Sequence, residues 1–194
     1  MYVLVVSLAG ALLLIAAHLI FMRVGRDYER QGRLTPFSSF LEVVIFALHG
    51  MASYLFLDSD LGHVRPGSPV IILAITAMVV GLALLAMAMG GLGMKRSVGQ
   101  EVTALKQSGL YRWSRNPQIV AYGLFVIGYA LLWPSWSGAV WVILYWLIGH
   151  MMVRTEEAHL NQVYGQAYAI YCSRTPRYIG LPNPAKRPGH LDAE

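Results

Sequence analysis

The sequence predicts an all-α integral membrane protein, a bundle of about five transmembrane helices without a Rossmann domain. Of its 194 residues, 56% are hydrophobic and only 13% are charged, whereas soluble domains carry about 25% charged residues. The charges are also clustered, which leaves several apolar stretches near the length of about 20 residues that a bilayer crossing needs. Alternate connections between these stretches are basic, as expected for a multi-pass membrane protein.

Five apolar stretches are expected to form the transmembrane helices, and they cover residues 2–22, 37–57, 69–89, 118–133 and 137–153. The first stretch lacks a basic n-region and is followed by four arginines, so we expect a retained helix and not a cleaved signal peptide. The second contains Glu42 and His49, and the third is the most uniformly apolar of the five.

The fourth and fifth stretches are separated by only three residues, Pro134, Ser135 and Trp136. So short a link predicts an antiparallel hairpin, and the tryptophans gathered at this end are typical of a bilayer interface. The helical pattern of the fifth stretch continues beyond the membrane to about Tyr164.

Lysine and arginine counts predict the orientation of the chain. Residues 23–36 contain four, residues 90–117 contain five and the chain after Val153 contains five more, whereas residues 58–68 contain one. The positive-inside rule then puts the N-terminus outside and the C-terminus in the cytoplasm of an inner or plasma membrane. The pI near 9.5 therefore reports orientation, and no nucleic-acid partner is expected.

The organisation follows from these spans. We expect three N-terminal transmembrane helices in residues 1–90 and a half with two transmembrane helices and long cytoplasmic segments in residues 91–181. A loose tail rich in proline, glycine and charge is expected over residues 182–194.

The segment 108–122, S-G-L-Y-R-W-S-R-N-P-Q-I-V-A-Y, combines two arginines, two aromatic residues and an Asn-Pro step before the fourth helix. Pro117 suits the first position of a helix, and Asn116 suits its cap. By pattern alone, this segment fits a capped membrane entry as well as it fits a binding site.

The segment 154–171 places Glu156 and Glu157 where the fifth helix leaves the bilayer. Adjacent helical residues point about 100° apart, so the two carboxylates have different tasks. Arg154 is spaced to pair with Glu157, and Glu156 is spaced to pair with His159. A solvated helix end with weak ion pairs is the simpler interpretation of this segment taken alone.

Glu42 and His49 lie seven residues apart and therefore share one face of the second helix. Ionisable groups inside a bilayer usually face a partner or a cavity. The two residues either tie helices together or line a functional path, and no pattern in the chain predicts a metal site.

Taken together, the second half of the chain resembles the superfamily of the isoprenylcysteine carboxyl methyltransferases and phospholipid methyltransferases. The family pattern is G-x-Y-x-x-x-R-H-P-x-Y, an apolar hairpin, E-E-x-x-L, an aromatic-Gly step and Y-x-x-Y before a basic Pro-Arg segment. The matching residues are Gly109, Tyr111, Arg115, Asn116, Pro117, Glu156, Glu157, Leu160, Tyr164, Gly165, Tyr168, Tyr171, Pro176, Arg177 and Tyr178. Asn116 replaces the usual His and Ile119 the usual Tyr, departures that leave room for a different acceptor.

The resemblance implies a bacterial-type methyltransferase that uses S-adenosylmethionine at the cytoplasmic membrane boundary. It implies catalytic roles for Arg115, Glu156 and Glu157, with a glutamate toward the amino group or sulfonium of the cofactor and Arg115 toward its carboxylate. The cofactor contacts that it implies are Gly109, Tyr111, Arg115, Asn116, Pro117, Gln118, Glu156 and Glu157.

The acceptor implied by the resemblance is a lipid, or a prenylated small molecule or peptide. The residues expected to contact it are Tyr122, Arg154, Glu42 and His49. Two alternatives remain open: a membrane reductase that uses NADPH, as sterol reductases do, and a non-enzymatic membrane protein. All methyltransferase roles require the fold to bring Arg115 and Glu157 together.

Overall fold

The computed structural model describes residues 1–57, 65–92 and 105–182, and all regular secondary structure in these ranges is helical, as predicted. The helices are α1 (Tyr2–Gln31), α2 (Pro36–Leu57), α3 (Ser68–Leu92), the 3-10 helix η1 (Gly109–Arg112), α5 (Pro117–Leu131), α6 (Trp136–Tyr164) and α7 (Gln166–Arg174). Four of them, α1, α2, α3 and α6, are long and apolar enough to cross a membrane.

The fourth expected span forms a shorter helix than predicted. α5 has 15 residues, fewer than the about 20 of a full crossing. It begins with Pro117 at its first turn, where the missing N–H leaves no bond unmade. By contrast, α6 has 29 residues and ends at Tyr164, which confirms the predicted continuation past the apolar stretch.

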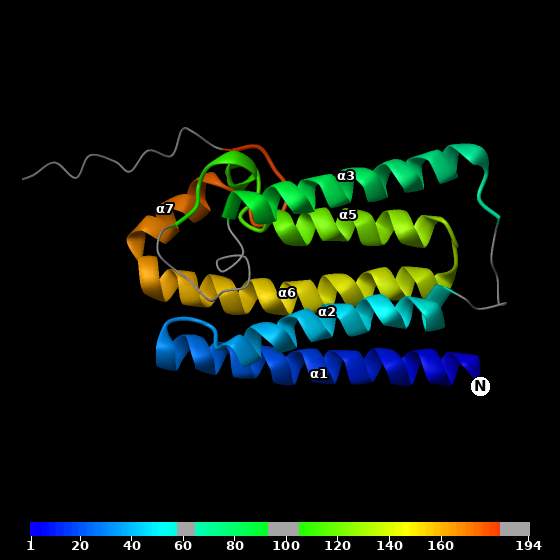
Figure 1. Ribbon diagram of the computed structural model, residues 1–194, viewed down its shortest axis with the longest axis horizontal. Helices are drawn as coiled ribbons and strands as arrows, with labels where there is room; N and C mark the ends of the chain where they lie inside the picture. The colour runs from blue at the N-terminus through cyan, green and yellow to red at the C-terminus, as the bar shows by residue number, and fades with distance from the viewer. Residues whose placement is uncertain (58–64, 93–104, 183–194) are drawn as a thin grey trace, which may run out of the picture.

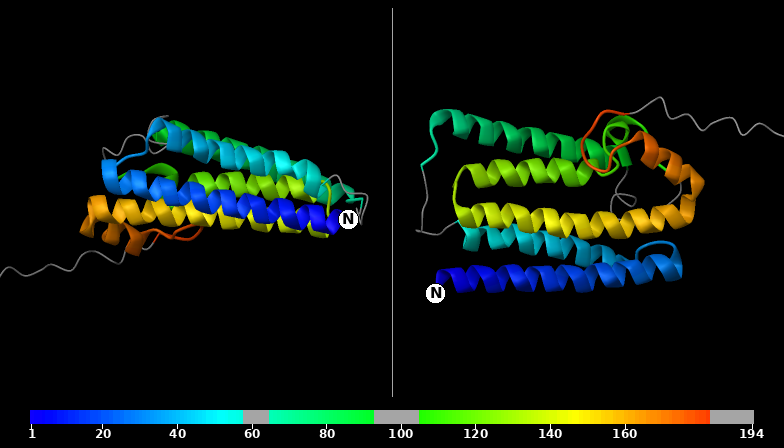
Figure 2. Two further views of the ribbon diagram at one scale, coloured as in Figure 1. Left: turned by 90° about the horizontal axis from the view of Figure 1, so that it is seen from below. Right: turned by 180° about the vertical axis from the view of Figure 1, so that it is seen from behind.

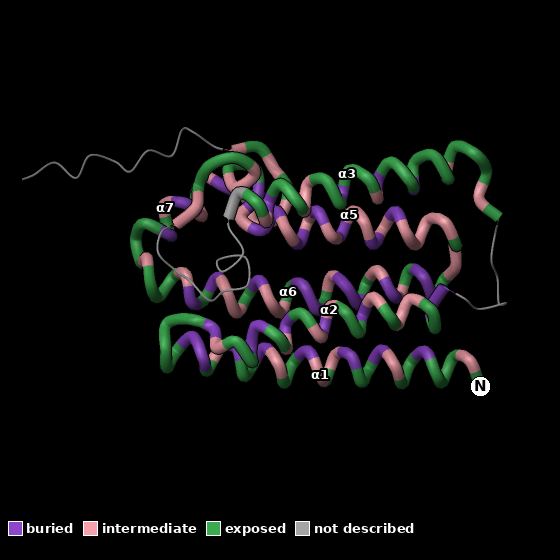
Figure 3. Tube along the Cα trace, viewed as in Figure 1, coloured by how far each residue is buried: buried purple, intermediate pink, exposed green. Residues whose placement is uncertain are grey.

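The long helices lie side by side, with α6 in the middle of the bundle (Figure 1). α6 packs against α1, α2 and α5, and α3 packs on the far side of α5. Trp141, Tyr145 and Ile148 of α6 are completely buried. Large apolar side chains cover the outer surfaces of α1, α2 and α3, and Figure 3 shows these exposed positions along the outside of the bundle, where lipid replaces water.

The helix connections gather at two opposite ends (Figures 1 and 2). The N-terminus and the turn between α5 and α6 lie at one end. The connection between α1 and α2, η1, the start of α5 and α7 lie at the other. This second end, which we call the basic end, therefore collects both sequence segments that resemble a methyltransferase.

Close backbone contact joins α3 to α5. A Cβ added to Gly81 would lie 2.8 Å from the carbonyl oxygen of Ala121, and one added to Gly128 would lie 2.6 Å from that of Ala74. Small residues of this kind let helices in lipid approach closely. The two glycines thus hold α3, which buries little else, against α5.

The predicted loose tail falls on residues 182–194, of which only Pro182 is among the described residues. Lys95 and Arg96, which contribute to the charge count of the connection before α5, also lie outside the described residues.

Candidate functional site

A carboxylate held between two arginines forms the centre of the basic end. Glu157 of α6 lies 3.2 Å from Arg115 Nη1 through one carboxylate oxygen and 2.8 Å from Arg177 Nη2 through the other. Arg177 Nε also donates to that second oxygen at 2.9 Å. The side chains of Glu157 and Arg115 are only 10% and 12% exposed, so the pair is largely removed from water. The predicted meeting of Arg115 and Glu157 is confirmed.

The backbone around Arg177 fastens the segment after α7 to the turn before α5. The Arg115 N–H donates to the carbonyl of Pro176 at 3.0 Å, and the Asn116 amide donates to the carbonyl of Arg177 at 3.0 Å. The Asn116 side chain thus makes a tertiary contact with the segment after α7. It makes no hydrogen bond to the first turn of α5. Asn116 therefore stands at the N-cap position of α5, as predicted, but without the side-chain bond of a helix cap.

α7 closes the same site from a third side. The Tyr171 hydroxyl donates to the carbonyl of Tyr111 at 2.7 Å, and Arg115 Nη1 contacts the Cys172 sulfur. Cys172 of α7 therefore belongs to the cluster as well. Gly109 begins η1 with φ of 64°, a left-handed conformation that glycine adopts at little cost, so the chain can turn into Tyr111.

Glu156 has different surroundings from its neighbour. No ion pair or hydrogen bond of its side chain is found among the described residues, whereas Glu157 has two arginine partners. Burial raises the pKa of Tyr111, and the charge of Glu156 raises it further. Burial is also the main cause that raises the pKa of Tyr171, with a smaller contribution from Glu156. Glu156 thus lies near both tyrosines, and its carboxylate has no ion pair or hydrogen bond with another described residue.

Neither of the ion pairs expected within α6 appears in the structure. Glu157 is held by arginines from outside the helix. His159 stacks on Tyr28 of α1 with ring centroids 4.0 Å apart. Long-range partners replace the local ones because the interior faces of α6 point at other helices, whereas a local pair needs an exposed helix surface.

The residues expected to contact an acceptor are spread over the bundle. His49 Nε2 lies 3.0 Å from the Trp141 carbonyl oxygen, and the Trp141 indole donates to the His49 carbonyl at 2.8 Å. His49 and Tyr122 both pack against Tyr145, with ring centroids 5.7 and 5.3 Å away. His49 therefore ties α2 to α6, and the structure shows no bond between it and Glu42.

Glu42 of α2 is buried, and it is close enough to Glu156 to interact with its charge. Arg154, in contrast, is exposed and lines a hollow between α1 and α6. It is not part of the Arg115–Glu157 cluster.

Other predicted cofactor contacts lie beside the cluster. Gln118 follows Pro117 in the first turn of α5, and its buried amide nitrogen has no hydrogen-bond partner among the described residues. Arg115 Nε is likewise buried without a hydrogen-bond partner in that part of the chain. These are donors that a bound polar molecule would satisfy.

Arg177 is the main residue that sequence reasoning missed. It belongs to the Pro-Arg-Tyr segment of the family pattern. Its distance from Glu157 along the sequence, however, does not predict a contact between the two side chains. The one indication that Arg177 has a role was the family pattern, in which a basic Pro-Arg segment follows Y-x-x-Y.

A family model described as phospholipid methyltransferase matches residues 69–167, about half of the chain. The match runs from α3 to the start of α7 and includes Arg115, Glu156 and Glu157. The comparison with curated proteins and the comparison with solved structures give no match.

Proposed function

Because the chain belongs to the phospholipid methyltransferase family, in the superfamily of the isoprenylcysteine carboxyl methyltransferases, we propose that it transfers the methyl group of S-adenosylmethionine to a lipidic or isoprenoid acceptor. The family and the four apolar helices make it an integral membrane protein. Our proposal adds the cofactor, the acceptor class and the location of the reaction at the basic end, on the cytoplasmic side of an inner or plasma membrane.

The observation that carries the proposal is the ion cluster of Glu157 with Arg115 and Arg177. Three segments far apart in the sequence meet there, at the one end of the bundle where the basic connections gather (Figure 1). A buried cluster of this kind is weak evidence for stability. Ionisable groups that are paired and buried near a membrane boundary mark a candidate binding site.

The residues of the basic end fit the polar groups of S-adenosylmethionine. Glu156 offers a carboxylate without an ion partner among the described residues, which suits the ammonium or the sulfonium of the cofactor. Gln118 and Arg115 each offer a buried N–H without a hydrogen-bond partner in the described structure, which suits a carboxylate or a hydroxyl. Gly109, Tyr111, Asn116 and Pro117 shape the turn that carries these donors.

The cofactor supplies an electrophilic methyl group, and the chain supplies placement and electrostatics. Since Arg115 Nη1 is engaged with Glu157 and Cys172, Arg115 acts first by fixing Glu157 and the start of α5. Arg177 holds Glu157 from the other side. The rigid turn then orients Gln118 and Tyr111, and correct orientation is the main requirement for a displacement at carbon.

Glu156 is the residue that we assign to the reacting groups. Its negative charge favours a bound cation, and it would accept a proton if the acceptor were an amine. We expect the acceptor to reach it from the bilayer, with Tyr122, His49 and Glu42 as the candidate contacts.

The experiment that tests the proposal uses the purified protein in lipid vesicles with methyl-labelled S-adenosylmethionine and total membrane lipid. We expect label in a lipid fraction from the wild-type protein and at least a hundredfold less from Glu156→Gln. Glu29→Gln, which removes an exposed carboxylate elsewhere at this end, is the matched control and should keep full activity.

A second measurement separates the alternatives. We expect S-adenosylhomocysteine to raise the apparent melting temperature and NADPH to leave it unchanged. Stabilisation by NADPH alone would favour a reductase. No binding of either molecule and no labelled lipid would remove the enzymatic proposal.

A further inference from the structure

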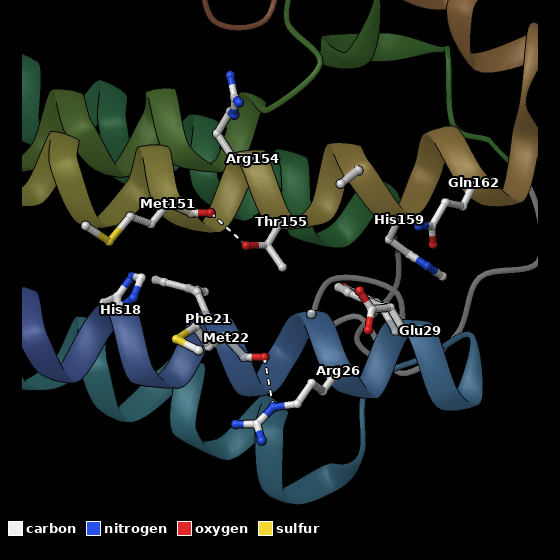
Figure 4. Close-up of a pocket in the computed structure, with 13 residues that line it drawn as sticks. His18, Phe21, Met22, Arg26, Glu29, Met151, Arg154, Thr155, His159 and Gln162 are labelled. Carbon is white, nitrogen blue, oxygen red and sulfur yellow. Dashed lines mark hydrogen bonds between the residues drawn. The ribbon is translucent and has the colours of Figure 1, made fainter.

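A hollow of about 470 Å³ lies between α1 and α6, and every described residue that lines it belongs to one of these two helices (Figure 4). We call it the α1/α6 groove. Two small residues, Gly25 of α1 and Ala158 of α6, line the space. A Cβ added to Gly25 would make ordinary van der Waals contact with the Thr155 methyl group, at 3.8 Å. Its volume is in the range of small-ligand sites.

The groove crosses the expected membrane boundary. His18, Phe21 and Met22 line its part within the first apolar stretch, and Met151 faces them from α6. In Figure 4, Phe21 and Met151 lie at this apolar part, between the two helices. The remainder of the groove extends beyond the apolar stretches of both helices, toward the basic end. A molecule that fills the groove must therefore be apolar at one end and polar at the other.

The polar part of the groove carries more positive than negative charge. Arg26 of α1 and Arg154 of α6 line its two sides, and Glu29 is the only acidic side chain among the described residues of the lining. All three are exposed, and Figure 4 shows the two guanidinium groups on opposite sides of the helix pair, each directed away from the space between α1 and α6. Arginines at the headgroup level of a bilayer attract phosphate groups, and their planar guanidinium binds phosphate well.

The groove and Glu157 lie on different sides of α6. Tyr28 and His159 stack at 4.0 Å and are both buried, and both line the groove. The lining positions of α6 repeat every three or four residues, whereas Glu157 lies about 200° around the helix from Thr155 and faces Arg115 instead. A molecule in the groove would not reach Glu157.

We infer that the α1/α6 groove binds a glycerophospholipid of the surrounding bilayer at a site separate from the Arg115–Glu157 cluster. Its phosphate lies at the rim with Arg26 or Arg154, and its glyceryl group and first methylenes fill the hollow beside Gly25 and Ala158. The bound lipid packs against these two small residues, which line the groove from α1 and α6.

The test uses phosphatidylcholine with a photoreactive diazirine near the glyceryl end of one acyl chain, and the full-length protein in vesicles. The headgroup nitrogen of this lipid already carries three methyl groups, so its binding does not depend on methyl transfer. Diacylglycerol with the same diazirine chain is the probe without phosphate. Cross-linked peptides are identified by mass spectrometry.

We expect phosphatidylcholine to label the groove residues of α1 and α6 at least fivefold more than diacylglycerol. Replacement of both Arg26 and Arg154 by Gln should abolish this preference, since each arginine near a membrane surface favours an anionic group by about fivefold. Excess inorganic phosphate should leave the labelling unchanged, and displacement by phosphate would show an anion site and not a lipid site.

Ala158→Trp should remove the labelling of the groove because the indole fills the hollow. Ala139→Trp, at an exposed position at the opposite end of α6, is its matched control and should label normally. Gly25→Leu fills the same hollow from α1 and decides the question if Ala158→Trp does not fold. Equal labelling by diacylglycerol, labelling spread evenly over the outer faces of α1, α2 and α3, or unchanged labelling of the filled variants would overturn the inference.

Discussion

Glu156 and Glu157 are adjacent in the sequence, but the fold gives the two carboxylates opposite surroundings. Glu157 is buried between Arg115 and Arg177. Glu156 has no ion pair among the described residues, and its charge reaches Tyr111 and Tyr171. We therefore assign positioning to Glu157 and contact with the reacting groups to Glu156.

Glutamine at each position separates these roles. Glu157→Gln leaves two arginines without their carboxylate partner, so we expect the free energy of unfolding to fall by about 3 kcal/mol. Glu156→Gln should unfold near the wild-type temperature, because it breaks no described ion pair, and should lose methyl transfer. Thermal unfolding in detergent together with the transfer assay measures both, and equal stability of the two variants would contradict the assignment.

Arg177 should matter only through Glu157. Its side chain is 35% exposed, so Arg177→Gln should lower the free energy of unfolding by about 1 kcal/mol in the wild-type chain. In the Glu157→Gln background the same change should have no effect or be slightly stabilising, because it removes one of two unpaired cations. A double-mutant cycle gives the coupling, and additive effects would show that the contact contributes nothing.

At the scale of the elements, the short helix α5 depends on its neighbours for its position. Glycines allow α3 to lie against it, and the Pro-Arg-Tyr segment after α7 is bonded to the turn that precedes it. Fixing α5 at its first turn fixes Arg115 as well. Since α5 is too short for a full crossing, its start lies deeper in the bundle than the end of α6, which allows the turn to fold over the carboxylates.

Two identical substitutions in α3 test the close contact with α5. Gly81→Ala puts a Cβ 2.8 Å from backbone atoms of Ala121 and Phe125, whereas nothing lies within 4 Å of a Cβ at Gly90. We expect Gly81→Ala to destabilise the protein by about 1–3 kcal/mol through overpacking and Gly90→Ala to be neutral or stabilising. Thermal unfolding of both variants checks this, and a neutral Gly81→Ala would mean that α3 and α5 are less tightly packed.

At the scale of the whole molecule, the fold determines which connections share an end of the bundle, whereas the distribution of charge determines which side of the membrane that end faces. The fold brings the α1–α2 connection, η1 and α7 to the same end of the bundle (Figure 2). Which side of the membrane this end faces is a prediction from the lysine and arginine counts. A water-soluble cofactor made in the cytoplasm requires the basic end to face inward.

Single cysteines test this orientation. In a Cys172→Ser background, Arg33→Cys lies in the connection between α1 and α2 and Ser68→Cys lies at the start of α3, and both positions are exposed. We expect a membrane-impermeant maleimide added to intact cells to label Ser68→Cys and not Arg33→Cys until the membrane is broken. The reverse labelling would place the basic end, and the proposed reaction, outside the cytoplasm.

The sequence alone determined the class of the protein, the existence and order of its apolar helices and the continuation of α6 to Tyr164. It did so because a bilayer imposes length and polarity on each span separately, so these features are readable from local composition. The family pattern also indicated segments 108–122 and 154–171, which contribute to the cluster, because the motifs of the family occur in a fixed order along the sequence.

Only the tertiary structure decided which side chains meet. Arg177 and Cys172 join Arg115, Glu157 takes partners from outside its own helix, and Arg154 lines the α1/α6 groove instead of pairing with Glu157. Helical spacing predicts neighbours within one helix, but it says nothing of which face another helix covers. That choice depends on how the small residues of α1, α3 and α5 let the helices pack, and packing is a property of the assembled bundle.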